Sequence, residues 1–303
     1  MARYLLITAQ TPKLESSMSN TLMIRALTLA ALLSAGSAQA FVIDGNLADW
    51  GLHRNGNASD WTPNDKVVAA WVIEDQHPSN GYLNPGYGGQ AYDAEAIYVA
   101  FDNSNLYIAI ATGHNPLTPN NPNNNSYGAG DIAIDFIDHG VKGSFDYGIE
   151  LLGNGTTTTR GHVYSNVNWA LGVWKSNGAW TGYRDPGAAG NIALADPSHP
   201  TSILGGTDVG TGSVAYTTLG QNKYGIWTGD LHYFYEVSVP LSSFGADWAE
   251  GKHFDVHWSQ NCANDSILVD PPVRATVPEP GTLALLPLGM LGIVALRRKQ
   301  VAA

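Results

Sequence analysis

The sequence is poor in cysteine, in basic residues and in helical periodicity. Cys262 is the only cysteine among 303 residues, so no disulfide can form within the chain. Lysine and arginine together number 15, against 26 aspartates and glutamates. A surface with this balance repels phosphate backbones, which argues against nucleic acid as a partner. No segment keeps an apolar stripe with a 3.6-residue period, so long amphipathic helices are not expected.

The common sequence signatures of enzymes are also missing. There is no Gly-x-Ser-x-Gly elbow, no His-Glu-x-x-His pair and no phosphate-binding loop. Residues 210–215 match the dinucleotide fingerprint by letter, but they have no βαβ surroundings. We therefore predict no catalytic residues and a protein that is not an enzyme. A carboxylate pair for hydrolysis stays open, because a sequence does not reveal how far apart its acids lie.

What the chain does contain is apolar residues, glycine and acids. Hydrophobic residues make up 44% of it, which is enough for a sizeable core, and 34 glycines indicate many tight turns. Between residues 41 and 276 there are 9 basic and 24 acidic residues, a formal charge of −15. A surface with this negative charge is compatible with binding of cations, especially calcium, and of neutral sugars.

The N-terminus carries the pattern of a secretory signal peptide. Arg25 precedes the apolar run Ala26–Leu33, and Ala38 and Ala40 supply the small residues that signal peptidase needs. We predict a signal peptide at 1–40, cleavage before Phe41, and export through the Sec translocon. Two internal methionines would give the signal peptide a more ordinary start: Met18 and Met23.

The last 27 residues, 277–303, combine three features. A Val-Pro-Glu-Pro motif at 277–280 favours extended backbone, because proline does not enter a following helix. The apolar stretch 281–296 would form a helix of about 24 Å, a marginal transmembrane span. The positive residues at 297–299 should stay cytoplasmic. The motif and the basic cluster consist of Pro278, Glu279, Pro280, Arg297, Arg298 and Lys299.

In combination these features resemble the PEP-CTERM sorting signal of Gram-negative bacteria. The resemblance implies that an exosortase in the inner membrane recognises the Pro-Glu-Pro stretch and cleaves nearby. The protein would then be held transiently in the inner membrane by its C-terminal helix, and would afterwards reach the cell surface or the extracellular polysaccharide. An ordinary C-terminal membrane anchor is the alternative.

The part of the chain between these ends reads as β-strands. Residues 95–101 and 106–111 flank the turn-forming Asp102-Asn103-Ser104-Asn105, which predicts a hairpin. Further strands are expected at 66–74, 131–137, 145–152, 161–174, 233–240 and 253–259. Loops are expected at 82–90, 114–130 and 176–212, the last as an insertion. We predict one all-β domain at 41–276, an antiparallel, jelly-roll-like β-sandwich.

Several segments of the body carry a second resemblance. Ile43-Asp44-Gly45-Asn46-Leu47-Ala48-Asp49-Trp50 resembles the opening of DOMON-like sandwiches, a group that includes family-nine carbohydrate-binding modules. The segments 96–110, 131–136 and 235–241 resemble the hairpin, the acidic strand and the "E-x-x-I-P-L" strand that follow in that group. The resemblance implies a β-sandwich and a link to carbohydrate. The blocks 85–95 and 257–265 resemble PEP-CTERM proteins of unassigned function.

Five oxygen-bearing side chains near the start of the body are candidate calcium ligands. They are Asp44, Asn46, Asp49, Asp93 and Glu95. Calcium takes six to eight hard oxygens from carboxylates, amides and main-chain carbonyls. The alternative is that Asp44 and Asp49 only cap turns at the entry of the first strand.

Three residues on one expected strand are candidate ligands for a transition metal. His253, Asp255 and His257 alternate, so a strand at 253–259 would project them from one face, opposite Phe254, Val256 and Trp258 in the core. Two imidazoles and a carboxylate can hold zinc. The alternative is the polar, solvent-facing side of a half-buried strand.

Aromatic residues in glycine-rich loops are candidates for stacking on sugar rings. They are Tyr82, Tyr87 and Trp180. Trp169 and Trp174 are expected to pack in the core instead. We therefore predict an exported sandwich that binds extracellular polysaccharide, as in a biofilm matrix. The alternatives are a secreted hydrolase that uses clustered carboxylates and a purely structural matrix protein.

Overall fold

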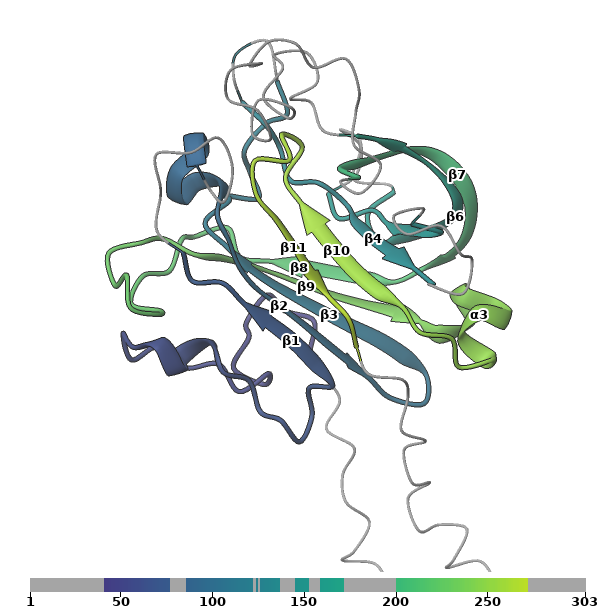
Figure 1. Ribbon diagram of the computed structural model, residues 1–303, viewed down its shortest axis with the longest axis horizontal. Helices are drawn as coiled ribbons and strands as arrows, with labels where there is room; N and C mark the ends of the chain where they lie inside the picture. Colours follow the sequence, from purple (N-terminus) through teal and green to yellow (C-terminus); the bar gives the residue numbers. More distant parts are fainter. Residues whose placement is uncertain are drawn as a thin grey trace, which may run out of the picture. The chain divides into compact units, whose positions relative to one another are not determined.

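The computed structural model describes residues 41–76, 86–121, 124, 126–136, 145–152, 159–171 and 200–271 (Figure 1). These parts form two antiparallel sheets. The five-stranded sheet contains, in spatial order, β1 (Ala70–Ile73), β2 (Ala94–Phe101), β3 (Asn105–Thr112), β9 (Tyr233–Pro240) and β8 (Ser213–Tyr216). The six-stranded sheet contains β11 (Ser266–Val269), β10 (Asp255–Ser259), β4 (Ile132–Asp135), β5 (Tyr147–Ile149), β6 (His162–Ala170) and β7 (Ser202–Thr211). The short helices are η1 (Ala58–Trp61), η2 (Gly86–Tyr92), η7 (Leu241–Phe244) and α3 (Gly245–Ala249).

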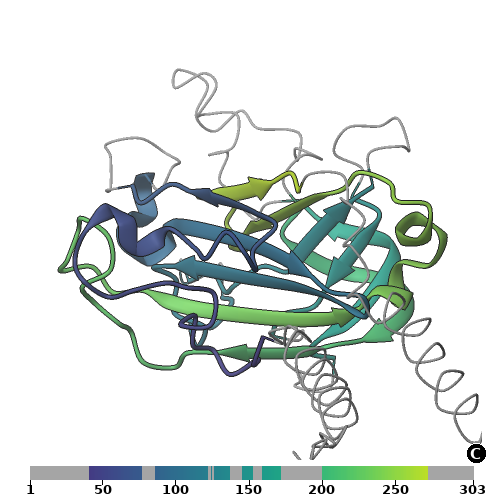
Figure 2. The ribbon, with the colours of Figure 1, turned by 90° about the horizontal axis from the view of Figure 1, so that it is seen from below.

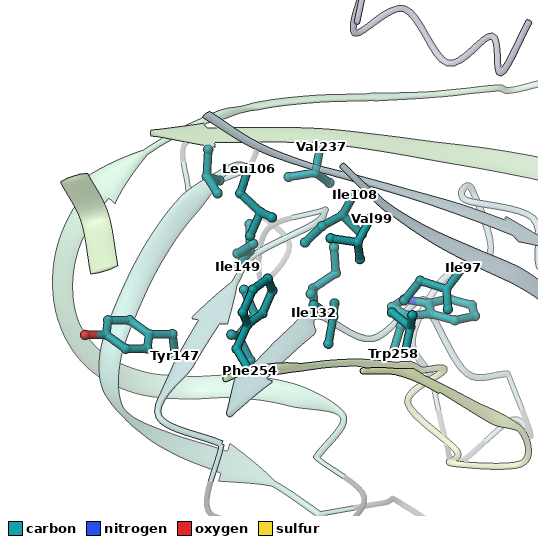
Figure 3. Packing of buried hydrophobic residues seen from close by; sticks show 14 of the residues in the cluster. Ile97, Val99, Leu106, Ile108, Ile132, Tyr147, Ile149, Val237, Phe254 and Trp258 are labelled. Atoms are coloured by element: carbon teal, nitrogen blue, oxygen red, sulfur yellow. The ribbon is translucent and has the colours of Figure 1, made fainter. Parts of the chain in front are cut away.

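The two sheets pack face to face, which confirms the predicted β-sandwich. Ile97, Val99 and Ile108 point inward from the five-stranded sheet and meet Ile132 and Trp258 from the six-stranded sheet (Figure 3). All five side chains are fully buried. Burying a large apolar side chain stabilises a fold by roughly 1.5–3 kcal/mol, so this layer is the main source of cohesion between the sheets.

A second apolar cluster covers the opposite face of the five-stranded sheet. The segment 41–68 lies across that face (Figure 2) and packs Leu47, Trp50 and Trp61 onto Tyr98 of β2. Tyr98 also donates its hydroxyl hydrogen to the main-chain oxygen of Trp61 at 2.8 Å. Because both faces of β2 are covered, this strand is apolar without alternation from Ala96 to Phe101, as buried strands generally are.

The predicted hairpin is confirmed as β2 and β3, which pair along nearly their whole length. Its turn is fixed locally, because Asp102 Oδ1 accepts hydrogen bonds from the main-chain nitrogens of Ser104 at 2.7 Å and Asn105 at 2.8 Å. An aspartate that bonds the backbone two residues ahead favours a tight turn. A few adjacent residues therefore determine the conformation of this turn.

Two of the sequence-based element predictions need correction. The expected strand at 66–74 is a strand only at 70–73, because the nitrogens of Val67 and Val68 both bond back to the carbonyl oxygen of Asn64 and form a turn. The expected loop at 176–212 contains β7 at its end, paired with β6. The glycines of β7 suggested a loop, but this edge strand accommodates them, and at Gly210 it leaves little room for a side chain: a Cβ there would lie 2.2 Å from Ser243 Oγ.

The described part of the chain contains no helix that is both long and apolar enough to cross a membrane. The predicted C-terminal helix at 281–296 and the sorting motif lie outside the described residues, as does the signal peptide.

Candidate functional site

Four carboxyl groups gather where the edges of the two sheets meet. We call Glu74, Asp93, Glu95 and Asp265 the carboxyl cluster. Glu74 follows β1, Asp93 and Glu95 flank the first residue of β2, and Asp265 immediately precedes β11. The Glu74 nitrogen donates to the carbonyl oxygen of Glu95 at 2.8 Å. The nitrogen of Ala94 donates to Asp265 Oδ2 at 2.8 Å, which ties the two sheets together at this point.

Three of the four carboxyl groups are almost entirely buried, and Glu74 is half-buried. Asp93 exposes 0% of its surface, and Glu95 and Asp265 expose 1% each. Asp265 is well supplied with donors, because its second oxygen accepts from its neighbour Ser266 at 2.9 Å. Glu95 Oε1 accepts from Gln90 Nε2 at 2.6 Å and lies 3.0 Å from His232 Nε2. One oxygen of Glu95 and both oxygens of Asp265 are thus held in place.

Asp93 has no comparable support. Within the described part of the chain, no main-chain N–H and no neutral side-chain donor reaches either of its carboxylate oxygens, and Glu95 Oε2 also lacks a donor there. The carboxyl groups of Asp93 and Asp265 lie within hydrogen-bonding range of each other, so a bond between them requires one to be protonated. Burial, followed by the negative charges of Glu95 and Asp265, raises the pKa of Asp93 to about 10.

The neighbours of Asp93 are shifted in the same direction. Burial raises the pKa of Asp265 to about 6, although the nitrogen of Ala94 and the Asp93 carboxyl group oppose the shift. Burial and the charges of Asp265 and Glu95 raise the pKa of Glu74 to about 7. Several carboxyl groups this close together cannot all be ionised at low energetic cost. The cluster is therefore stabilised when some of them are protonated or when a cation binds.

The structure separates the five predicted calcium ligands into two groups. Asp93 and Glu95 belong to the carboxyl cluster, whereas Asp44, Asn46 and Asp49 lie in the turn that precedes η1. In that turn Asp44 Oδ1 accepts from the nitrogen of Asn46 at 2.8 Å, and Asp49 Oδ2 from the nitrogen of Val42 at 2.9 Å. The oxygen of Asn46 accepts from Ala48 at 3.1 Å. These contacts are those of turn caps.

The N-terminal turn is attached to β9 through Glu236. This carboxylate is fully buried and accepts from three donors: the nitrogens of Asp44 and Gly45, and Trp50 Nε1 at 2.8 Å. Gly45 has a φ of +83°, and a Cβ there would lie 2.9 Å from the Tyr216 carbonyl carbon, so glycine fits the position. Two of the segments that carry the DOMON-like resemblance are therefore joined by one structural carboxylate.

The predicted transition-metal residues lie along β10 and just before it. Phe254, Val256 and Trp258 enter the core as predicted. His253 is exposed, whereas His257 exposes only 2% and its ring centre lies 5.3 Å from that of Phe145. Among the described residues, no group of three or more His, Cys, Asp and Glu side chains is arranged to hold a metal ion, so the structure does not bring His253, Asp255 and His257 together in this way.

Of the aromatic candidates, only the backbone of Tyr87 is described, as part of η2, whereas Tyr82 and Trp180 lie outside the described residues. Trp169, expected in the core, is half-buried and donates from Nε1 to the carbonyl oxygen of Phe145 at 3.1 Å. Trp174 also lies outside the described residues. Cys262 is buried, with 1% of its surface exposed.

The structure contains an exposed aromatic residue, Trp71, that was not predicted from the sequence. Trp71 on β1 exposes 37% of its surface and is one of the residues that line an open groove of about 440 Å³ between β1 and β11. We call this the β1–β11 groove. Its lining consists of Ala70, Trp71, Val72, Leu268, Val269 and Asp270. Sequence reasoning missed Trp71 because it sits in the middle of an apolar strand, where a tryptophan is expected to face the core.

Comparison with known proteins identifies the C-terminal segment. Residues 276–299 match the family model of the PEP-CTERM protein-sorting motif. This is an exosortase-sorted, exported protein. The match covers Pro278, Glu279 and Pro280, the apolar stretch and the basic cluster at 297–299, and it confirms the predicted sorting segment. No curated protein matches the chain.

The PEP-CTERM motif implies the route of an exported protein that is held transiently at the membrane and sorted to the cell surface. Signal-peptide cleavage before Phe41 stays a prediction, because Ala38 and Ala40 lie outside the described residues. Phe41 itself packs on Trp50 and Tyr107, with ring centres 4.2 and 5.1 Å apart. The first residue of the expected mature chain is therefore part of the fold.

Proposed function

We propose that the sandwich of this exosortase-sorted protein binds a neutral glycan strand in the β1–β11 groove. The observation that carries the proposal is that an exposed tryptophan, Trp71, and an exposed acid, Asp270, both line an otherwise apolar groove. Sugar rings stack their C–H faces on aromatic rings, while carboxylates accept hydrogen bonds from their hydroxyl groups.

Shape and charge both support a neutral polymer. The groove is open to solvent and lies between the edge strands of the two sheets, where an extended polymer can reach it from outside. The formal charge of −15 between residues 41 and 276 repels polyanions. A neutral polysaccharide at the cell surface also matches the destination to which the PEP-CTERM motif directs the protein.

A hydrolase that uses clustered carboxylates is less well supported. Asp93, Glu95 and Asp265 are buried acids that interact with one another, yet each exposes at most 1% of its surface. A glycosidase must bring two carboxyl groups to either side of a bound sugar. The carboxyl cluster as it stands gives a polymer no access.

The test is affinity electrophoresis of the purified protein in gels that contain neutral or anionic polysaccharides. We expect retardation by a neutral polymer, and Trp71→Ala to weaken it about tenfold, or 1.4 kcal/mol. Trp227→Ala is the matched control, because Trp227 is equally exposed, at 38%, but lies outside the groove. Unchanged binding by Trp71→Ala, or retardation by anionic polymers alone, would contradict the proposal. Retardation by no polymer would favour a purely structural matrix protein.

A further inference from the structure

Four buried oxygen atoms at the start of β2 are hydrogen-bond acceptors that receive no donor. They are both carboxylate oxygens of Asp93, Oε2 of Glu95 and Oε1 of Gln90. Buried polar atoms in proteins nearly always have a partner, and each one without a partner costs about 1–3 kcal/mol. All four come from one stretch of six residues, and as long as the two carboxyl groups are ionised none of the four can act as a donor to another.

The amide of Gln90 has a determined orientation. Its Nε2 donates to Glu95 Oε1 at 2.6 Å, and the reversed amide would place oxygen against that carboxylate. Gly113, just after β3, packs directly on Gln90: a Cβ there would lie 1.6 Å from its carbonyl oxygen and 2.8 Å from Nε2. Gln90 is therefore held against the carboxyl cluster with its Oε1 as a further acceptor.

The charges around these oxygens are unbalanced. Glu74, Asp93 and Asp265 repel one another, and the nearest basic group in the described residues is the His232 imidazole, already 3.0 Å from Glu95 Oε1. Burying an unpaired carboxylate is very costly, and a bound cation removes that cost. Two carboxylates without donors carry a formal charge of −2, which one divalent ion would neutralise.

We propose that this end of the sandwich binds a calcium ion, with the carboxylates of Asp93 and Glu95 and the amide oxygen of Gln90 as its side-chain ligands. Calcium accepts irregular sets of six to eight carboxylate, amide, carbonyl and water oxygens, whereas magnesium demands near-octahedral geometry and keeps several waters. Zinc prefers nitrogen and sulfur ligands. Because no three described His, Cys, Asp or Glu side chains form a metal group by themselves, main-chain and water oxygens would complete the coordination.

Such an ion would stabilise the contact between the start of β2 and the turn before β11, where the carboxyl groups otherwise repel one another. Asp93 contacts Asp265 across the sheets, and Asp265 holds the nitrogens of Ala94 and Ser266. The blocks around 85–95 and 257–265, which are far apart in the sequence, are brought together at this point. An ion between them would therefore stabilise η2, the start of β2 and the turn before β11 as one unit.

The experiment is thermal unfolding of the purified protein in EGTA, in calcium and in magnesium, together with titration calorimetry using calcium chloride. We expect calcium to raise Tm and magnesium to have a much smaller effect. The mechanism is linkage, since an ion that binds only the folded state stabilises it. Equal Tm in calcium and EGTA with no heat of binding would overturn the proposal in favour of a protonated Asp93–Asp265 pair, and equal effects of both ions would overturn its selectivity.

Two substitutions locate the ion. Asp93→Asn and Glu95→Gln keep the shape of the side chains, and we expect each to lower calcium affinity on the order of 100-fold. The matched control is Asp131→Asn, another buried carboxylate, whose two oxygens already accept from the nitrogens of Leu151 and Ile203. The exposed Asp208→Asn serves if that control does not fold. A full calcium response in folded Asp93→Asn would place the ion elsewhere and overturn the assignment.

Discussion

Glu236 and Asp93 are both buried with 0% exposure, and burial raises the pKa of both, yet their surroundings differ in kind. Glu236 accepts hydrogen bonds from two main-chain nitrogens and from Trp50 Nε1. Asp93 has no donor except a neighbouring carboxyl group. Burial by itself therefore says little about the role of a carboxylate. The number of donors distinguishes a carboxylate that builds the fold from one suited to bind a ligand.

The largest expected effect is that of removing the well-supported carboxylate. Glu236→Ala leaves the Trp50 indole N–H and the nitrogens of Asp44 and Gly45 buried without an acceptor, and it detaches the N-terminal layer from β9. We expect a loss of roughly 3–5 kcal/mol in the free energy of unfolding, measured by urea denaturation. Glu250→Ala, whose side chain is 62% exposed, should change it by less than about 0.5 kcal/mol. Similar small losses for both variants would contradict the structural role of Glu236.

The second prediction is that replacing a carboxyl group by an amide raises Tm at Asp93 and lowers it at Glu236. In EGTA at neutral pH the wild type must protonate Asp93 on folding or bury its charge, because burial raises the pKa of this group to about 10. Asp93→Asn is neutral in both states and still supplies a donor, so we expect stabilisation of about 1 kcal/mol, or 2–4 °C in Tm. Glu236→Gln directs an amide N–H at groups that are already donors, and should lower Tm. Thermal unfolding of the two variants beside the wild type measures both effects. If both variants raise Tm, or both lower it, then the number of donors does not distinguish the role of Asp93 from that of Glu236.

How much of this could be predicted depends on how local each feature is. The hairpin at 102–105 was predicted correctly, because Asp102 and its neighbours determine the turn. The inward face of β10 was also correct, because alternation places Phe254, Val256 and Trp258 together. His257 was expected on a solvent face but is buried, because Phe145 covers it and no local pattern in the sequence records that contact.

Contacts between residues that are far apart in the chain could not be predicted from the sequence. Ala94 and Asp265 are 171 positions apart, and Asp44 and Glu236 are 192 apart. The segments that contain them were noticed one by one, but periodicity carries no information about which segments meet. The calcium prediction therefore grouped Asp44, Asn46 and Asp49 with Asp93 and Glu95 on the basis of their oxygen-bearing side chains alone, and the structure separates the two groups.

The smallest expected effect is a difference in the pH dependence of stability. Burial raises the pKa of Glu236 to about 7 from an ordinary value of 4.5, despite its three donors and with a small contribution from the charge of Asp49. Between these two values the folded chain binds more protons than the unfolded chain, so the contribution of Glu236 falls as the pH rises.

Because Glu74 and Asp131 also have pKa values near 7, the wild-type slope is shared among several groups. We therefore expect Glu236→Gln to flatten the slope between pH 4.5 and 7 by no more than about 1.4 kcal/mol per pH unit. Urea unfolding at half-unit pH steps would measure it, with Glu250→Gln as the control. A steeper slope in Glu236→Gln would mean that its three donors, rather than burial, govern the ionisation of Glu236, which would sharpen its contrast with Asp93.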